Sequence, residues 1–168
     1  MNYALIGCGR IANAAHIPSY LKCDDVEIKY FCDIIPERAE KAVETYGCGT
    51  AITDYHVALA DPEVDAVFVL TPNFAHYTVT MDALRAGKHV MCEKPITVNY
   101  AMSVEMAQEA KKCGKMLNIG VCNRYHASVE RLEKLYRERE DFAEAMKAYP
   151  NANGTENVLK LIFKAVEK

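Results

Sequence analysis

The stretch ALIGCGRIANA, residues 4–14, places a glycine-rich turn between an apolar run and a helical pattern. Its spacing is G-x-G-x-x-A, with Gly7 and Gly9 as the glycines and alanine in the third small position. The first glycine permits a tight turn, the second lets the main chain approach a pyrophosphate, and the third small residue packs helix against strand. The N-terminus of the following helix offers free N–H groups to the anion. The stretch therefore predicts a dinucleotide-binding turn, with a simple chain reversal as the alternative.

An acidic residue follows at the spacing of a ribose-binding carboxylate. Asp33 ends the second apolar run, about 20 residues beyond the turn, where it can accept both ribose hydroxyls of an adenosine. Its charge would repel a 2′-phosphate, so the predicted cofactor is NAD, with NADP less favoured. Arg10 and Arg38 can still pair with that phosphate and so limit the preference, while Ile11 completes the predicted cofactor contacts at the turn. The alternative is that Asp33 only caps the next helix.

Short apolar runs alternate with longer helical patterns as far as Val121. The runs, which lack strict polar alternation, are YALIG, VEIKYFCD, VDAVFVL, KHVMC and KMLNIGV. Such runs suit strands that are covered on both faces, and their alternation with helices predicts a doubly wound α/β fold. We expect a six-stranded parallel sheet within residues 2–121. Asn73 and Asn99 are expected to cap two of the helices.

The chain is predicted to have two parts, a dinucleotide-binding domain over residues 1–122 and a helical extension over residues 123–168. In the extension, TENVLKLIFKAVEK (residues 155–168) carries apolar residues on more than one helical face. A lone surface helix shows a narrower stripe, so this helix is expected to dock on its own core or on a second subunit. The expected assembly is a homodimer.

The composition excludes several kinds of function for this protein. The 168 residues are 51% hydrophobic and 26% charged, as in an ordinary globular protein, and a net charge of −3 gives no general attraction for nucleic acid or anionic membranes. No run approaches the roughly 18 apolar residues of a membrane span, and the N-terminus lacks the features of a signal peptide. The seven cysteines form no CxxC pair, which favours reduced core residues over disulfides or a metal site. These features predict a cytoplasmic protein without a metal.

Several motifs together resemble one family. GCGRIA at residues 7–12, the acid at Asp33, TPNFAHYTVTMDALRAGKHVMCEKPIT at residues 71–97 and RYH at residues 124–126 are similar to those of the Gfo/Idh/MocA oxidoreductases. The resemblance runs almost continuously from residue 1 to about residue 130. It implies a Rossmann domain that binds NAD(P). It also implies oxidation or reduction of a hydroxyl carbon, usually of a sugar, cyclitol or related small-molecule substrate.

The resemblance also implies roles for particular residues. The lysine of the EKP motif, Lys94, would lie beside the nicotinamide and the substrate hydroxyl. The other implied site residues are Thr71, Pro72 and Asn73 in a loop under the nicotinamide ribose, His76 as a second catalytic candidate, Glu93, and Asn123 and Arg124 on the way out of the sheet. As a lone histidine, His76 can equally be a helix-surface residue. His16, His56 and His89 are assigned no role.

The chemistry of a lysine fits this position. A lysine at a partly closed strand end can have its pKa lowered by desolvation, and can then polarise a hydroxyl or relay its proton as hydride leaves the same carbon. Glu93 is expected to hold the ammonium in place, and Pro95 to fix the main chain. The alternative is an exposed ion pair before a turn.

The chain departs from the family after the first domain. Members continue with an α/β domain on a mostly antiparallel sheet, which supplies a further acid/base residue and the substrate pocket. Here RLEKLYRERE leads directly to a stretch that resembles the family's C-terminal tail, so we infer an internal loss with the ends joined near residues 137–141. Two functions remain open, an NAD-dependent oxidoreductase and a dinucleotide-binding module without turnover. NAD-dependent glycosidic cleavage, which also occurs in the family, is a third.

Overall fold

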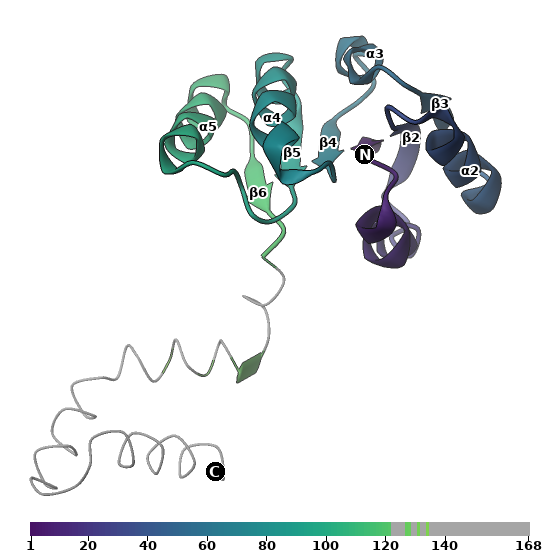
Figure 1. Cartoon of the computed structure of the whole chain (residues 1–168), viewed down its shortest axis with the longest axis horizontal. Helices are drawn as coiled ribbons and strands as arrows, with labels where there is room; N and C mark the ends of the chain where they lie inside the picture. The colour runs from purple at the N-terminus through teal and green to yellow at the C-terminus, as the bar shows by residue number, and fades with distance from the viewer. Residues whose placement is uncertain (122–126, 129–130, 132–133, 135–168) are drawn as a thin grey trace, which may run out of the picture. The chain divides into compact units, whose positions relative to one another are not determined.

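Six short strands form one parallel sheet in the order β3-β2-β1-β4-β5-β6. The computed structural model describes residues 1–121, 127, 128, 131 and 134. The chain divides into two compact units, Met1–Val121 and Cys122–Lys168, and the sheet lies in the first (Figure 1). The strands are β1 Asn2–Ile6, β2 Glu27–Cys32, β3 Thr50–Ile52, β4 Ala66–Val69, β5 His89–Cys92 and β6 Leu117–Ile119.

Helices cover both faces of this sheet, because neighbouring strand residues point to opposite sides. On β1, Ala4 and Ile6 join one apolar cluster and Leu5 joins the other. The first cluster includes residues of α3 (Tyr55–Ala60), α4 (His76–Arg85) and α5 (Tyr100–Cys113), which lie along one side of the sheet in Figure 1. The second includes residues of η1 (Ala12–His16), α1 (Ile17–Tyr20) and α2 (Pro36–Tyr46). The predicted doubly wound fold is confirmed.

The strand order indicates the edge of the sheet at which a cofactor is expected to bind. Successive strands are added outward from β1 on one side as far as β3 and from β4 on the other side, so the strand order reverses between β1 and β4. These two parallel strands lie side by side in register from Tyr3 opposite Ala66 to Ile6 opposite Val69. In open α/β sheets, ligands bind outside the carboxyl ends of the strands at such a reversal. The turn at Gly7 and the loop at Thr71 follow these two strands directly. They therefore border the expected binding crevice.

Two helix starts were predicted from asparagine, and one prediction is wrong. Asn99 accepts a hydrogen bond from the Ala101 N–H at 2.8 Å and caps α5 as expected. Asn73 instead begins a 3-10 turn, η2 (Asn73–Ala75), and no side-chain hydrogen bond caps α4. Pro72 is the N-cap of this turn and Asn73 is its first residue, so Asn73 already has helical geometry. An N-cap residue needs a non-helical conformation.

The cysteines of the described residues are all free thiols, six of the seven in the chain. Cys8, Cys32 and Cys92 are buried in the core, as predicted, whereas Cys23 is exposed and Cys48 and Cys113 are half-buried. Burial, followed by the nearby Asp33 charge, raises the pKa of Cys8 to about 12 and of Cys32 to about 12. Within the described part of the chain, no helix is long and apolar enough to cross a membrane. No cluster of metal-ligating side chains occurs there either.

An ionic cluster ties β2 to the segment before β4, at the amino edge of the sheet. The Lys29 Nζ lies 2.7 Å from Asp61 Oδ2, and the Tyr30 hydroxyl donates to the same oxygen at 2.8 Å. The hydrogen bond from Lys29, followed by those from the Glu63 N–H and from Tyr30, lowers the pKa of Asp61 to about 2. Because this pKa is depressed on folding, ionised Asp61 stabilises the folded state above its unfolded value.

We therefore expect Asp61→Asn to lower the free energy of unfolding at neutral pH. The difference from the unmodified protein should shrink as the pH falls below about 4, and be small near pH 2, as both states bind the proton. Urea titrations at several pH values measure it, with Asp24→Asn, an exposed carboxylate at the same edge, as control. A difference that grows on acidification would contradict the expectation.

Candidate functional site

The two glycines of the turn are required for different reasons. Gly7 has a φ of +103°, and a Cβ there would lie 2.6 Å from the main-chain oxygen of Leu70. Its small size is therefore demanded by the fold itself. Gly9 has no positive φ, and a Cβ there would meet nothing within 4 Å among the described residues. The open space over Gly9 would let a pyrophosphate approach the main chain closely.

Asp33 lies at the end of β2 and is only 7% exposed. Its Oδ2 accepts the N–H of Cys8, inside the glycine turn, and its Oδ1 accepts the N–H of Ile35, both at 2.9 Å. Arg38 Nη1 lies 4.0 Å from Oδ1. Each carboxylate oxygen can accept a second hydrogen bond, so both retain capacity for ribose hydroxyls. Asp33 thus shapes the turn and keeps acceptor capacity for a ligand.

Asn13 holds the same turn from its helical side, which the sequence did not suggest. The Asn13 Nδ2 donates to the carbonyls of Cys8 at 2.8 Å and of Gly9 at 2.9 Å. Tyr46 on α2 in turn donates to Asn13 Oδ1 at 3.2 Å. The sequence does carry a signal for this contact, because Asn13 lies one turn beyond the second glycine and asparagine side chains commonly hydrogen-bond to nearby main-chain groups.

The side chain of Glu93, in the EKP motif at residues 93–95, contacts groups other than the one predicted. Glu93 is 9% exposed, and its Oε2 accepts the main-chain N–H of Lys94 at 2.9 Å. Its Oε1 lies 2.7 Å from His16 Nε2, and the other ring nitrogen of His16 lies 2.8 Å from the Tyr20 hydroxyl. The predicted pairing of Glu93 with the Lys94 ammonium is therefore wrong, because the carboxylate is already bound to His16. A role for His16 was missed.

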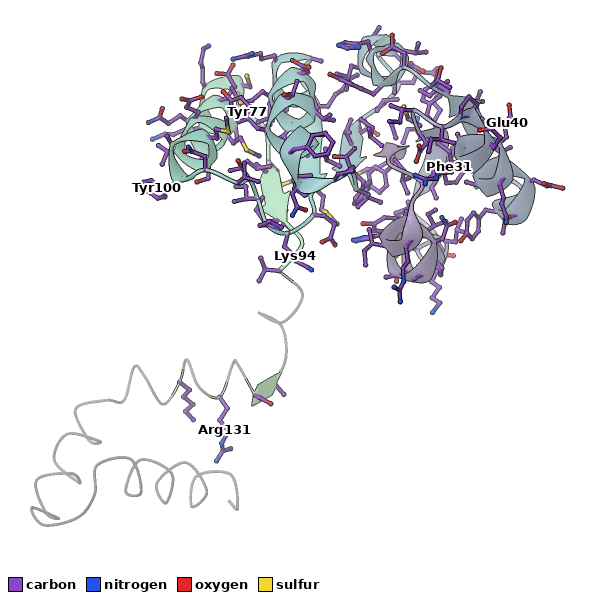
Figure 2. All side chains as sticks on the ribbon, viewed as in Figure 1. Phe31, Glu40, Tyr77, Lys94, Tyr100 and Arg131 are labelled. Carbon is purple, nitrogen blue, oxygen red and sulfur yellow. The ribbon has the colours of Figure 1, made fainter. Side chains whose placement is uncertain are left out.

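The Lys94 side chain has no partner among the residues that the structure describes. It is exposed and lies at the edge of the sheet, beyond β5 and β6, in Figure 2. No described residue hydrogen-bonds to its ammonium or pairs with it. The burial expected for this lysine is thus not provided by residues 1–121. The Lys94–Pro95 peptide bond is cis.

The loop after β4 supplies an unsatisfied polar atom. The Oγ1 of Thr71 is buried and has no hydrogen-bond partner in the described residues, whereas Pro72 and Asn73 are exposed. A buried hydroxyl without a partner is costly, and a bound ligand can satisfy it. Together with the open space over Gly9 and the spare lone pairs of Asp33, it fits a dinucleotide along this edge.

His76 does not occupy the place expected of a catalytic group. It is 1% exposed, with Nδ1 at 2.7 Å from the Pro95 carbonyl oxygen and Nε2 at 2.8 Å from that of Thr71. Neither nitrogen is available to a substrate in this arrangement, so the catalytic candidacy of His76 does not fit its placement. Arg10 and Ile11 are exposed at the start of the helix after the turn. Asn123 and Arg124 lie outside the described residues.

The comparisons with known proteins agree on one family. Residues 1–121 match the GFO_IDH_MocA model, described as an oxidoreductase family with an NAD-binding Rossmann fold. D-glucoside 3-dehydrogenase of Escherichia coli is 34% identical over 134 residues, which are 80% of this chain and 38% of that protein. Inositol 2-dehydrogenase/D-chiro-inositol 3-dehydrogenase of Lactiplantibacillus plantarum is 34% identical over 113 residues, 66% of this chain and 32% of that protein.

Solved structures give the same result. The dehydrogenase WlbA from Chromobacterium violaceum, in complex with NADH and UDP-GlcNAcA, superposes with a TM-score of 0.76 at 34% identity, over 83% of this chain and 40% of that chain. A 3-ketoreductase from Actinomadura kijaniata, in complex with NADP and TDP-benzene, gives a TM-score of 0.75 at 28% identity, over 82% of this chain and 42% of that chain. The present chain spans about two fifths of the length of the relatives it matches.

Proposed function

Because the chain belongs to the Gfo/Idh/MocA oxidoreductase family, we propose that it interconverts a hydroxyl carbon and a carbonyl of a sugar or cyclitol with NAD. The observation that carries the proposal is the free Lys94 at the same sheet edge as the open glycine turn and buried Asp33. The printed names of two relatives, a glucoside and an inositol dehydrogenase, support the substrate class.

The chain's own residues would hold the cofactor along the carboxyl edge. The turn at Gly9, with Arg10 and Ile11, would take the pyrophosphate at the start of the helix. Asp33 would accept the adenosine ribose hydroxyls. Arg38 would lie beside that ribose. The nicotinamide half would lie by the loop after β4, where the residues involved are Thr71, Pro72 and Asn73.

Lys94 would handle the proton. Bound NAD⁺ supplies the hydride acceptor for the substrate carbon. Lys94 would take the proton of the substrate hydroxyl as hydride leaves the same carbon, which leaves a carbonyl, and would return the proton in the reduction direction. Glu93 fixes the main chain at Lys94 through its 2.9 Å hydrogen bond, and His16 fixes Glu93. Asn123 and Arg124 are proposed to lie near the substrate.

The remaining proposals concern the whole protein. We propose a cytoplasmic homodimer, supported by the broad apolar surface expected for residues 155–168, and a helical extension at residues 123–168 retained after loss of a sheet domain. Light scattering on the full chain tests the assembly, and a monomer at micromolar concentration would reject it. These residues lie largely outside the described ones.

The function and its cofactor can be tested together. In thermal-shift measurements, NAD and NADH should each raise the melting temperature of the protein. In a turnover assay, the protein should then form NADH from NAD with at least one substrate of a panel that includes myo-inositol and glucosides. Stabilisation by NAD without turnover of any member would favour the dinucleotide-binding module instead. No stabilisation by either nucleotide would reject both functions.

Replacing Asp33 with asparagine should narrow the preference for NAD over NADP by about tenfold, the size of one lost charge-assisted contact. The substitution removes the charge that repels a 2′-phosphate, while Arg38 remains able to pair with it. Calorimetric titration of both nucleotides measures the ratio, with Asp24→Asn as the matched control. Equal binding of NAD and NADP by the unmodified protein would contradict the assignment.

A further inference from the structure

The carboxyl group of Glu93 lies where three segments distant in the sequence meet. Its Oε2 accepts the main-chain N–H of Lys94 at 2.9 Å, and its Oε1 lies 2.7 Å from the Nε2 of His16, the last residue of η1. The third segment is the chain that leaves β6, where the Gly120 N–H donates to the Cys92 carbonyl at 2.8 Å. Glu93 is only 9% exposed, so its carboxyl group is enclosed by these segments.

Gly120 leaves the space that this carboxyl group occupies. Gly120 does not have a positive φ, so its main-chain conformation does not itself require glycine. A Cβ at this position would lie 3.0 Å from Glu93 Oε1 and 3.2 Å from Glu93 Cδ, closer than the optimal separation of non-bonded atoms. An alanine at position 120 would therefore displace the same oxygen that contacts His16.

The ring of His16 is fixed by aromatic packing on its other side. Its Nδ1 lies 2.8 Å from the Tyr20 hydroxyl, and the Tyr20 ring packs on Phe68 of β4 with the centroids 4.2 Å apart. The Tyr3 ring lies edge-on to Tyr20 at 6.5 Å. The contact of His16 with Glu93 needs one proton between the two groups, which either of them can supply. The contact therefore does not depend on which group is charged.

We propose that His16 and Gly120 are positioning residues that act on Lys94 through Glu93. The ring of His16 and the space at Gly120 fix the Glu93 carboxyl group, and this group fixes the main chain of Lys94 through its N–H. The assignment of Lys94 to proton transfer rests on the proposed function. Because η1 follows the glycine turn, this link connects the element proposed to bind the pyrophosphate with the residue proposed to move the proton.

The link can be measured on the protein without any ligand, by NMR hydrogen exchange at the Lys94 amide. We expect exchange in the unmodified protein to be slowed about tenfold by the hydrogen bond to Glu93. His16→Ala should remove this protection, and His16→Gln, whose amide can contact the same oxygen, should retain it. The His89 amide, which donates to the Asp65 carbonyl at 3.0 Å, is the internal control and should not change. An unprotected Lys94 amide in the unmodified protein, or equal acceleration at Lys94 and His89, would overturn the link.

Gly120→Ala tests the same link while leaving His16 in place. The Lys94 amide should again lose its protection, because the added methyl group displaces Glu93 Oε1. In the double variant with His16→Ala, exchange should be no faster than in His16→Ala alone, since both substitutions act on one carboxyl group. Normal protection in Gly120→Ala, or effects of the two substitutions that multiply, would reject the shared action through Glu93.

The effect on catalysis separates positioning from a merely structural role. In both single variants, kcat should fall about tenfold because Lys94 is misplaced, while NADH affinity should change by less than about twofold. His56→Ala, which removes a histidine whose side chain is 63% exposed, is the matched control and should change neither. Normal kcat in a variant whose Lys94 amide has lost its protection would reject the positioning role. If the unmodified protein shows no turnover, the proposed function falls, while the exchange rates still decide the link.

Discussion

Replacing Lys94 with alanine is expected to lower the turnover of a sugar or cyclitol substrate by about a thousandfold, the typical contribution of a positioned acid or base. The side chain is exposed and has no partner among the described residues, so its removal leaves the folded structure without a lost contact. The melting temperature and the affinity for NADH should therefore change little. Initial rates, thermal melts and NADH titrations measure the three quantities.

The matched control is Lys111→Ala, which removes another exposed lysine, on α5, away from the carboxyl edge. It should leave rate, stability and binding unchanged. A Lys94→Ala protein that keeps more than about a tenth of the unmodified rate would remove Lys94 from the chemistry. The proton would then have to be carried by another group.

The two glycines of the turn should respond to alanine in opposite ways. At Gly7, the positive φ of +103° and the 2.6 Å approach to the Leu70 oxygen leave no room for a Cβ. We expect Gly7→Ala to cost roughly 2–4 kcal/mol of unfolding free energy, because both strain and a main-chain clash must be relieved. At Gly9 a Cβ would meet no atom of the described residues within 4 Å, so stability should change by less than about 1 kcal/mol.

For NADH binding by the folded proteins, we expect the larger loss in Gly9→Ala and the smaller loss in Gly7→Ala. Gly9→Ala places a methyl group where a pyrophosphate would approach the main chain, so NADH affinity should fall by about a hundredfold, near 2.7 kcal/mol. Urea unfolding and NADH fluorescence, measured on both variants, separate the two effects. A Gly9→Ala protein that binds NADH normally would show that the cofactor does not cross this turn.

The fold was largely predictable because its signals are local. Apolar runs marked five of the six strands. The glycines that end α2 and α5, Gly47 and Gly114, both have positive φ, which is also a local signal. The location of β3 was not assigned, because Thr50–Ile52 lies between Gly49 and Thr53 and is not part of a longer apolar run. The equally short β6 was marked because it lies within the apolar run KMLNIGV.

The site was predictable only where its residues follow strands directly. Gly7, Asp33 and Lys94 could be placed at one edge because each comes just after an apolar run. The His16–Glu93 contact spans 77 residues and has no local pattern. Glu93 and Lys94 suggested an ion pair because they are adjacent, but neighbouring side chains of an extended chain point apart. The buried position of His76 depends on two loops that close over the start of its helix, which the sequence does not reveal.

The hydrogen bond from Cys8 to Asp33 has a consequence for how this protein can evolve. The carboxylate that would select the cofactor also accepts an N–H inside the glycine turn, at 2.9 Å. A mutation of Asp33 that relaxes cofactor choice therefore also leaves a buried donor without its acceptor, which costs about 1–3 kcal/mol. Natural proteins hold little stability in reserve, so such a mutation is tolerated only after a stabilising change elsewhere. Nucleotide preference at this position is thus inherited together with the geometry of the turn, and the two cannot drift independently.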